Sequence, residues 1–383
     1  MLNSNLTVTE ITGWLQEKDE EKLAELYAVA DRVRRERVGD EVWLRGLIEL
    51  SNYCRRNCLY CGVRASRRVE RYRMTREEIL ERAKLAYEYQ FGTLVMQAGE
   101  DFALDESFIA DLIREIREKY RLAITLSLGE RKDSEYARWK EAGADRCLLR
   151  FETSNRELYR AIHPNAENSV FQDRIELLKR LREIGYEIGS GVMIGIPGQT
   201  YEDLANDLAL FRELDLDMIG CGPFLPHSAT PLGRIEARNG RWRTVPIPET
   251  ASEDLQEIPL PTNKPFDYPT SDRQVPNNNE LAFKVVALAR ILCPDANIPS
   301  TTAVATVDEI GGRKGALERG ANVVMPNLTP EKYRRLYEIY PNKAASREEA
   351  EKTRQTALRQ IREIGRVPGI GPGTSPRFLK RRA

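Results

Sequence analysis

The chain alternates short apolar runs with amphipathic helical segments, and this rhythm limits the folds open to it more than any other feature. Eight runs are predicted to be β-strands, at residues 43–50, 93–97, 122–128, 146–152, 187–196, 217–222, 298–302 and 322–325. Helical patterns at 75–90, 106–119, 133–142, 171–184, 201–213 and 280–292 lie between most of them. Repeated βα units form a parallel sheet with right-handed crossovers. We therefore expect an α/β fold, and eight units favour a (β/α)8 TIM barrel over an open doubly wound sheet.

The predicted barrel occupies residues 41–341, between N-terminal helices and a C-terminal extension. Residues 1–40 are predicted to form two polar helices, the second closed by Gly39. Residues 234–279 interrupt the rhythm after the sixth strand. They are rich in proline and polar residues without a clean period, and we expect a partly ordered surface loop. Residues 342–383 are expected to form one helix and a loose tail.

Composition excludes several classes of function. The 59 basic and 59 acidic side chains cancel and 41% of the residues are hydrophobic, so neither disorder nor a nucleic-acid surface is indicated. No run of about 18 apolar residues is present, and no basic segment precedes an apolar stretch at the N-terminus. We therefore expect a cytoplasmic protein with no membrane and no nucleic-acid partner.

Three of the six cysteines lie within eight residues, directly after the first predicted strand. Cys54, Cys58 and Cys61 form a C-x3-C-x2-C motif, and the chain has only two histidines. A metal site here must be mainly thiolate, which favours zinc or an iron–sulfur cluster. Structural zinc takes four ligands, and no fourth Cys or His follows within 80 residues. Three thiolates suit a 4Fe–4S cluster with one iron left open, at the end of the barrel where such enzymes place their chemistry.

The fourth predicted strand carries charged residues on the face that should line the barrel. Alternation places Arg150 and Glu152 inward and Cys147, Leu149 and Phe151 outward. Charged groups inside a barrel need partners or ligands, so these two side chains are either a ligand site or a mutual ion pair.

The cysteine motif resembles that of the radical S-adenosylmethionine superfamily, C-x3-C-x-aromatic-C, with Tyr60 as the aromatic residue. The resemblance implies a 4Fe–4S cluster on the three cysteines, whose open iron binds S-adenosylmethionine, and reductive cleavage of that cofactor to a 5′-deoxyadenosyl radical. Residues 98–100 are similar to the superfamily's Gly-Gly-Glu segment, with alanine at the first position. The cofactor contacts implied by the resemblance are Tyr60, Gly99, Glu100, Glu152, Arg174, Gly195 and Ile196.

Six further stretches resemble one family, the FeFe-hydrogenase maturases HydE, at residues 71–74, 125–130, 148–153, 222–227, 298–303 and 320–327. The resemblance implies action on an iron–carbonyl–cyanide–cysteine complex. It also implies a reductant such as ferredoxin or flavodoxin, and HydG and HydF as partner maturases. The implied substrate contacts are Thr125, Arg150, Met218, Thr301, Thr302 and Tyr333. Met218 as core filler and Tyr333 as an aromatic residue on a helix face are the alternatives.

Many members of this family hold a second cluster on three C-terminal cysteines. This chain has no cysteine after Cys293, so we expect a single cluster. The alternatives within the superfamily are a methylornithine-synthase-like mutase acting on lysine and a biotin-synthase-like sulfur inserter. The second is disfavoured because Cys147 and Cys221 are predicted to point away from the lumen. An electron carrier is a further alternative, but carriers normally supply all four cluster ligands from protein.

Overall fold

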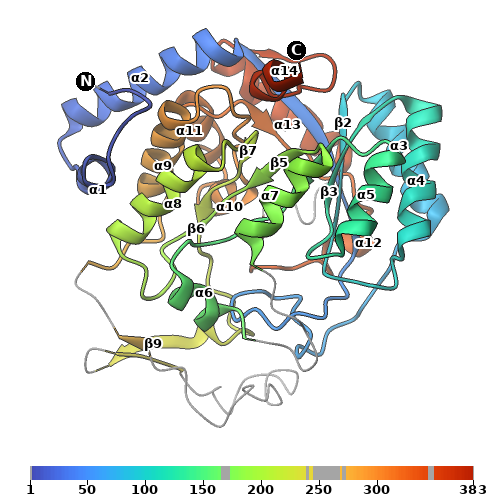
Figure 1. The fold of residues 1–383 in the computed structure, drawn as a ribbon, viewed down its shortest axis with the longest axis horizontal. Coiled ribbons are helices and arrows are strands. Elements are labelled where there is room, and N and C mark those ends of the chain that lie inside the picture. The colour runs from blue at the N-terminus through green and yellow to red at the C-terminus, as the bar shows by residue number, and fades with distance from the viewer. Residues whose placement is uncertain are drawn as a thin grey trace.

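The computed structural model describes residues 2–164, 173–238, 241–244, 268–269, 273–343 and 349–382. Parallel strands form one curved sheet in the order β12-β1-β2-β3-β4-β5-β7 (Figure 1). Residues 297–299 close the ring, because Asn297 bridges to Met218 and Pro299 to Val323, both in parallel. The predicted eight-membered barrel is therefore confirmed. Its strands are β1 (Glu41–Ser51), β2 (Thr93–Ala98), β3 (Ala123–Ser127), β4 (Arg146–Leu148), β5 (Glu187–Ser190), β7 (Met218–Ile219) and β12 (Val323–Val324).

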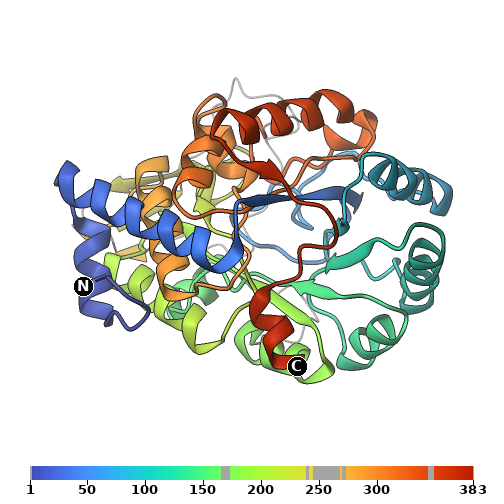
Figure 2. The ribbon, with the colours of Figure 1, turned by 90° about the horizontal axis from the view of Figure 1, so that it is seen from above.

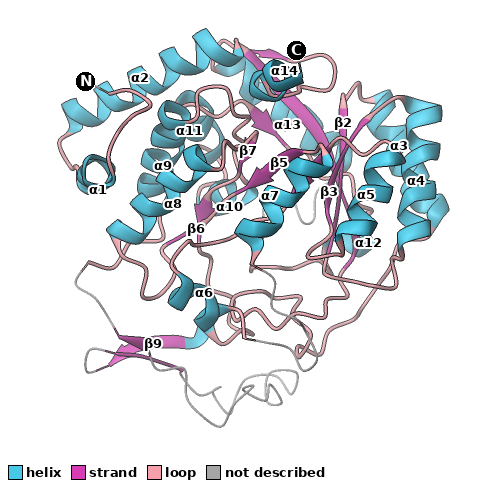
Figure 3. Cartoon of the chain, viewed as in Figure 1, coloured by secondary structure: helices cyan, strands magenta, loops and turns pink. Residues whose placement is uncertain are grey.

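Helices surround the strands (Figure 3). The predicted helices are present as α3 (Arg76–Glu88), α4 (Glu106–Tyr120), α5 (Asp133–Glu141), α7 (Arg174–Ile184), α8 (Tyr201–Glu213) and α9 (Asn279–Leu292). Capping boxes start two of them, where the hydroxyls of Thr75 and Thr200 accept hydrogen bonds from backbone N–H groups of the first turn. Four short helices were not predicted: α6 (Arg156–Ile162), α10 (Thr302–Val307), α11 (Gly312–Glu318) and α12 (Glu331–Arg334).

Two predicted strands are split by a close approach of their backbones. A Cβ atom on Gly191 would lie 1.8 Å from the carbonyl oxygen of Gly220, so the first of the two strands needs glycine where they meet. Beyond this point the strands continue as β6 (Met193–Ile194) and β8 (Gly222–Pro223), which pair in parallel as a separate ladder. The seventh predicted strand is also shorter than expected, because Thr302 already begins α10.

The insertion contains a small antiparallel sheet formed by β9 (Ile235–Arg238), β10 (Arg241–Thr244) and β11 (Tyr268–Pro269). The remainder of the predicted loop at 239–240, 245–267 and 270–272 lies outside the described residues. Figure 1 shows β9 at the same end of the barrel as α6, opposite the end that carries α2 and α14. None of the described helices is long and apolar enough to cross a membrane.

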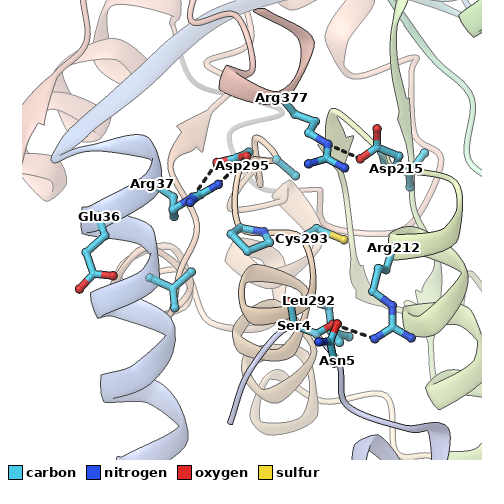
Figure 4. Close-up of a pocket in the computed structure, with 14 residues that line it drawn as sticks. Ser4, Asn5, Glu36, Arg37, Arg212, Asp215, Leu292, Cys293, Asp295 and Arg377 are labelled. Carbon is cyan, nitrogen blue, oxygen red and sulfur yellow. Dashed lines mark hydrogen bonds and ion pairs between the residues drawn. The ribbon is translucent and has the colours of Figure 1, made fainter. Parts of the chain in front are cut away.

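The N-terminal helices, α1 (Val8–Gln16) and α2 (Glu20–Val38), correspond to the two predicted ones. Ion pairs and hydrogen bonds fix this end of the chain to the barrel (Figure 4). Arg37 donates two hydrogen bonds of 2.8 Å to Asp295, and Arg212 donates one of 2.7 Å to the carbonyl oxygen of Ser4. These residues line a pocket of about 470 Å³ whose three arginines each have a protein partner.

The C-terminal segment comprises α13 (Ala350–Glu363), β13 (Val367–Pro368) and α14 (Pro376–Arg382). The expectation of a loose tail is wrong, since β13 pairs with β1 and the following residues cross the end of the barrel (Figure 2). The carbonyl oxygen of Gly373 accepts hydrogen bonds from Arg45 Nη2 (3.0 Å) and Asn297 Nδ2 (2.9 Å). The tail is ordered because its carbonyl groups satisfy donors buried at the barrel floor.

A buried ion pair forms the centre of this floor. Arg146 Nε lies 2.6 Å from Glu187 Oε2, and the two side chains are 0% and 1% exposed. Arg146 also donates to Thr93 and to the carbonyl oxygen of Pro372, while Glu187 accepts from the backbone N–H of Ser375. The pair therefore joins three strands to the C-terminal tail.

We predict that Arg146→Met lowers the free energy of unfolding by about 3–5 kcal/mol, because it leaves the Glu187 carboxylate buried without its cation. Urea denaturation followed by circular dichroism measures the change. Arg180→Met is the matched control, since Arg180 is 40% exposed and pairs at the surface, and it should shift stability by no more than about 0.5 kcal/mol. Equal stability of the two variants would contradict the importance of this pair.

Candidate active site

A cavity of about 340 Å³ lies inside the barrel, a size that suits a small molecule. Its walls follow the alternation of the strands, in which every second side chain points inward. Neither Cys147 nor Cys221 lines it, as predicted. The lining residues from the strands and their ends include Arg45, Leu47, Glu49, Val95, Gln97, Thr125, Ser127, Leu148, Arg150, Glu152, Met218, Gly220, Gly222, Asn297, Pro299, Thr301, Val323 and Met325.

Five of the six predicted substrate residues come together in this cavity: Thr125, Arg150, Met218, Thr301 and Thr302. Tyr333 is not among the lining residues. Its ring stacks on that of Tyr72, with 4.4 Å between centroids, and its hydroxyl group hydrogen-bonds to Glu78. The cavity is lined instead by Tyr340 and Lys343 from the following segment. Tyr333 lies on the short helix α12, which agrees with the alternative of an aromatic residue on a helix face.

Arg150 and Glu152 form an ion pair inside the cavity, 2.9 Å between Nη2 and Oε2. Glu152 adopts a left-handed backbone conformation with φ of 65°, which is unfavourable for a residue with a side chain. Burial raises the pKa of the Glu152 carboxyl. Among the described residues, Arg150 Nε and the hydroxyl of Thr125 have no hydrogen-bond partner. The predicted structural alternative, a mutual ion pair, is therefore present, and it leaves polar atoms free to bind a ligand.

The cysteine loop follows β1 and is held by a single guanidinium. Arg71 donates hydrogen bonds to the carbonyl oxygens of Asn52 (2.5 Å), Val63 (2.8 Å), Arg64 (2.7 Å) and Arg67 (2.9 Å). Four carbonyl groups from both ends of the loop thus share one donor group. This arrangement fixes the shape of the segment that carries Cys54, Cys58 and Cys61.

The three thiols of the loop have perturbed acidities. Burial raises the pKa of all three, that of Cys54 to about 11, and the pKa of Cys61 is raised further by Cys54 and Cys58. The Cys54 sulfur accepts hydrogen bonds from the backbone N–H groups of Arg56 (3.5 Å) and Glu100 (3.4 Å). Within the described part of the chain, no three Cys, His, Asp or Glu side chains are arranged as a metal site.

The surroundings of the thiols nevertheless fit a thiolate-bound cluster. Arg64 is 1% exposed, and none of its three guanidinium nitrogens has a hydrogen-bond partner among the residues described. The thiols of Cys58 and Cys61 are the groups whose negative charge would favour its protonated form. An unpaired buried cation is costly, whereas an anionic cluster beside it would supply the missing counter-charge.

The turn after β2 packs directly on the cysteine loop. A Cβ atom on Gly99 would lie 2.2 Å from the carbonyl oxygen of Tyr53 and 2.8 Å from Cys54 Cβ, so the close approach requires glycine. The Glu100 carboxylate accepts a hydrogen bond of 3.0 Å from the backbone N–H of Glu130, and burial raises its pKa. Gly99 and Glu100 thus lie beside the proposed cluster ligands.

Glu130 is a site residue that sequence reasoning missed. Arg174 Nε donates to Glu130 Oε1 at 2.8 Å, and its Nη1 donates to the carbonyl oxygen of Arg150 at 2.8 Å. Arg56 lies 3.5 Å from the same carboxylate. The predicted cofactor residue Arg174 lines the cavity and is held in place by these contacts. The available signal was the position of Glu130, just after the third strand.

The turn after β6 holds Gly195, whose φ is 83°, and a Cβ atom on it would lie only 2.5 Å from Asn277 Cβ, so a side chain is excluded. Gln199, also missed from the sequence, accepts hydrogen bonds from the N–H groups of Gly195 (2.8 Å) and Ile196 (3.3 Å). Ile196 belongs to a buried apolar cluster with Leu59. Neither Gly195 nor Ile196 lines the cavity, but this cluster joins their turn to the cysteine loop.

Tyr60 lines the cavity and is oriented by a neutral histidine. Burial lowers the pKa of His163 well below its usual range. Its Nδ1 lies 2.9 Å from the carbonyl oxygen of Tyr159 and must carry the proton, so Nε2 accepts the hydrogen bond from the Tyr60 hydroxyl at 2.9 Å. The aromatic residue of the cysteine motif is thus fixed in one orientation.

Comparison with known proteins agrees with this site. Residues 48–211 match the Radical SAM superfamily. The solved structure of methylornithine synthase (PylB) superposes with a TM-score of 0.72 at 23% identity, over 95% of this chain and 94% of that one, and so shares the fold. The barrel, the cysteine loop and the superfamily match over residues 48–211 define a radical S-adenosylmethionine enzyme. This class uses a 4Fe–4S cluster and S-adenosylmethionine.

Two curated relatives narrow the class. The chain is 44% identical to the [FeFe] hydrogenase maturase subunit HydE of Thermotoga maritima over 356 residues, 93% of this chain and 90% of that protein. It is 26% identical to 3-methylornithine synthase of Methanosarcina acetivorans over 321 residues, 83% of this chain and 79% of that protein. The chain belongs to the HydE family.

Asp207 on α8 makes the stability of this site depend on pH. Its carboxylate accepts hydrogen bonds from the backbone N–H (2.5 Å) and hydroxyl (2.6 Å) of Ser154, and lies 3.4 Å from Gln199 Nε2. Burial raises the pKa of Asp207 to about 7. Between about pH 4 and pH 7 the folded protein therefore holds a proton that the unfolded chain has released. The contribution of Asp207 to the free energy of unfolding must fall as the pH rises through this range.

We predict that Asp207→Asn removes this contribution, so that the variant loses less stability than the wild type between pH 5 and pH 7. Urea denaturation at both pH values measures the two differences. Asp133→Asn, at an exposed position on α5, is the control and should keep the wild-type pH dependence. An unchanged pH dependence in Asp207→Asn would show that another group is responsible.

Proposed function

We propose that the protein is a HydE-type hydrogenase maturase that acts on a small iron–carbonyl–cyanide–cysteine complex bound inside its barrel. The observation that carries the proposal is the shared cavity: Tyr60 and Cys61 of the cysteine loop line the same space as Arg150 and Thr125. The 44% identity over 93% of the chain supports this choice of reaction within the superfamily.

Cys54, Cys58 and Cys61 are the proposed ligands of the cluster. When bound, the 4Fe–4S cluster and S-adenosylmethionine supply the chemistry, in which reductive cleavage of the cofactor gives a 5′-deoxyadenosyl radical. The role of the protein is to bind, orient and exclude water. The loop is suited to this role because Arg71 fixes its backbone.

The proposed cofactor contacts come from the cysteine loop, from the ends of strands and from the start of α7. Glu100 and Glu152 are carboxylates for the methionine amino group, and the guanidinium of Arg174 suits its carboxylate. Glu130 holds Arg174 in position at 2.8 Å. The remaining proposed contacts are Tyr60, Gly99, Gly195 and Ile196.

The proposed substrate contacts combine one guanidinium group with several hydroxyl groups. Arg150 lies 31% exposed in the cavity and can bind the carboxylate of a cysteine-derived ligand through two parallel hydrogen bonds. The hydroxyl of Thr125, which has no hydrogen-bond partner among the described residues, is a second polar contact. The proposed set also includes Met218, Thr301, Thr302 and Tyr333. Tyr333 does not line the cavity, so it would have to act from outside it.

Several broader assignments belong to the same proposal. The cell would supply electrons through ferredoxin or flavodoxin, and HydG and HydF would be the partner maturases in the cytoplasm. We divide the chain into N-terminal helices (1–40), the radical S-adenosylmethionine barrel (41–341) and a C-terminal extension (342–383).

A second candidate is a mutase acting on lysine, as the name 3-methylornithine synthase of a relative suggests. A cavity arginine suits the carboxylate of any amino acid. The lower identity of 26% makes this the weaker candidate.

We predict that Cys58→Ala abolishes the EPR signal of the reduced cluster, because two thiolates do not hold it. The matched control is Cys147→Ala, which removes a buried thiol outside the cavity and should keep full iron content. Iron and sulfide analysis after anaerobic reconstitution checks both variants. Full iron content in Cys58→Ala would refute the ligand assignment.

The function itself is tested by anaerobic turnover with S-adenosylmethionine, offering the iron–cysteine complex and lysine in parallel. We predict consumption or adenosylation of the iron complex and no methylornithine. Arg150→Lys should still cleave the cofactor but lose at least about tenfold in substrate turnover, because lysine lacks the planar fork. Methylornithine formed from lysine would replace the maturase proposal with the mutase.

A further inference from the structure

Arg64 is the least satisfied charged side chain near the proposed cluster. The segment from Cys54 to Arg73 contains seven arginines and one acidic residue, Glu70, although the formal net charge of the whole chain is zero. Arg71 uses its guanidinium to bind carbonyl groups of the loop, and Arg67 bonds to the carbonyl oxygen of Gly62. Arg64 is more deeply buried than either, at 1% exposure.

All three guanidinium nitrogens of Arg64 lie without a hydrogen-bond partner in the described ranges. Burial, with a smaller effect of the neighbouring Arg234, lowers the pKa of Arg64 to about 10. Only Cys58 and Cys61 act in the opposite direction, by the negative charge that their thiolates would carry. The counter-charge that this cation lacks is therefore to be found on the thiol side.

The backbone of Arg64 is held in the cysteine loop by two hydrogen bonds. Its N–H lies 3.2 Å from the carbonyl oxygen of Cys61, and its own carbonyl oxygen accepts a hydrogen bond of 2.7 Å from Arg71. Residue 64 is thus fixed at both peptide groups within one turn of the last cysteine. Arg64 is therefore held at a fixed place in the cysteine loop, three residues after the last cysteine, with its guanidinium buried and without a partner among the described residues.

We propose that Arg64 is a positioning residue for electron entry, whose guanidinium provides the counter-charge of the thiolate-bound cluster and raises its reduction potential. The inference rests on the proposed function, since it requires the cluster. Reduction adds one negative charge to the cluster, and a nearby cation stabilises the reduced state more than the oxidised one. Hydrogen bonds to sulfur and net charge are the means by which proteins set such potentials.

The test uses three variants of the full-length protein after anaerobic reconstitution. Arg64→Met keeps the length of the side chain and removes the charge, while Arg64→Lys keeps the charge and removes the fork. Arg68→Met removes a charge from the same loop at an exposed position and is the control. Iron and sulfide content is measured first, and an EPR-monitored redox titration without substrate follows.

We predict that Arg64→Met retains the iron content of the wild type but is harder to reduce, by at least tenfold in the ratio of reduced to oxidised cluster at a fixed potential. For a one-electron couple this shift corresponds to about 59 mV. Arg64→Lys should stay within about threefold of the wild type, and Arg68→Met should not change. An unaltered potential in Arg64→Met with an intact cluster would overturn the proposal.

Loss of the cluster from Arg64→Met would also distinguish between two roles of Arg64. Iron retained in Arg64→Lys but lost from Arg64→Met would support a counter-charge, whereas loss from both would mean that Arg64 serves the fold of the loop. Failure of the wild type to assemble any cluster would instead refute the proposed function. The two failures are therefore distinguishable.

Discussion

The hydrogen bonds of Arg71 are the contact on which the site depends. A loop that leaves a strand and turns back inside a protein carries carbonyl groups that neither water nor a sheet can satisfy. Arg71 meets four of them, from Asn52 at the start of the loop to Arg67 near its end. Only arginine has five donors in one rigid plane, so lysine could not replace it. Arg71 thereby fixes the backbone of the loop that carries the three cysteines.

Close backbone contacts connect the fixed cysteine loop to the rest of the barrel. The cysteine loop lies against Gly99, where a Cβ atom would come within 2.2 Å of a carbonyl oxygen. The strands on the other side of the cavity meet at Gly191 and Gly220 with a similar lack of space. The polar network of Glu130 and Arg174 connects the third strand to the start of α7. The loops around the cavity therefore form one packed layer.

Alternation in the strands made much of this predictable from the sequence. The repeated βα units predicted the eight-membered barrel, and the period of two within each strand placed Arg150 inward and Cys147 and Cys221 outward. Side chains that act from turns could not be predicted in the same way. Gln199 binds the turn that holds Gly195, but nothing in its sequence neighbourhood shows that its amide points back to that turn. The order of the C-terminal tail was likewise hidden, because the carbonyl groups of Pro372 and Gly373 that bind the barrel floor leave no mark in a side-chain pattern.

The C-terminal segments also determine how much space the barrel encloses. The floor is closed by residues 372–375, which bind strand side chains through carbonyl groups. Towards the cysteine loop, the carbonyl oxygen of Ile339 accepts a hydrogen bond of 2.9 Å from the N–H of Gly62, and Lys343 pairs with Glu49 of β1. Because Ile339, Tyr340 and Lys343 all line the cavity, a stretch beyond the last strand shapes both the cysteine loop and the substrate space. Residues 339–343 after the last strand therefore shape this cavity together with the strands.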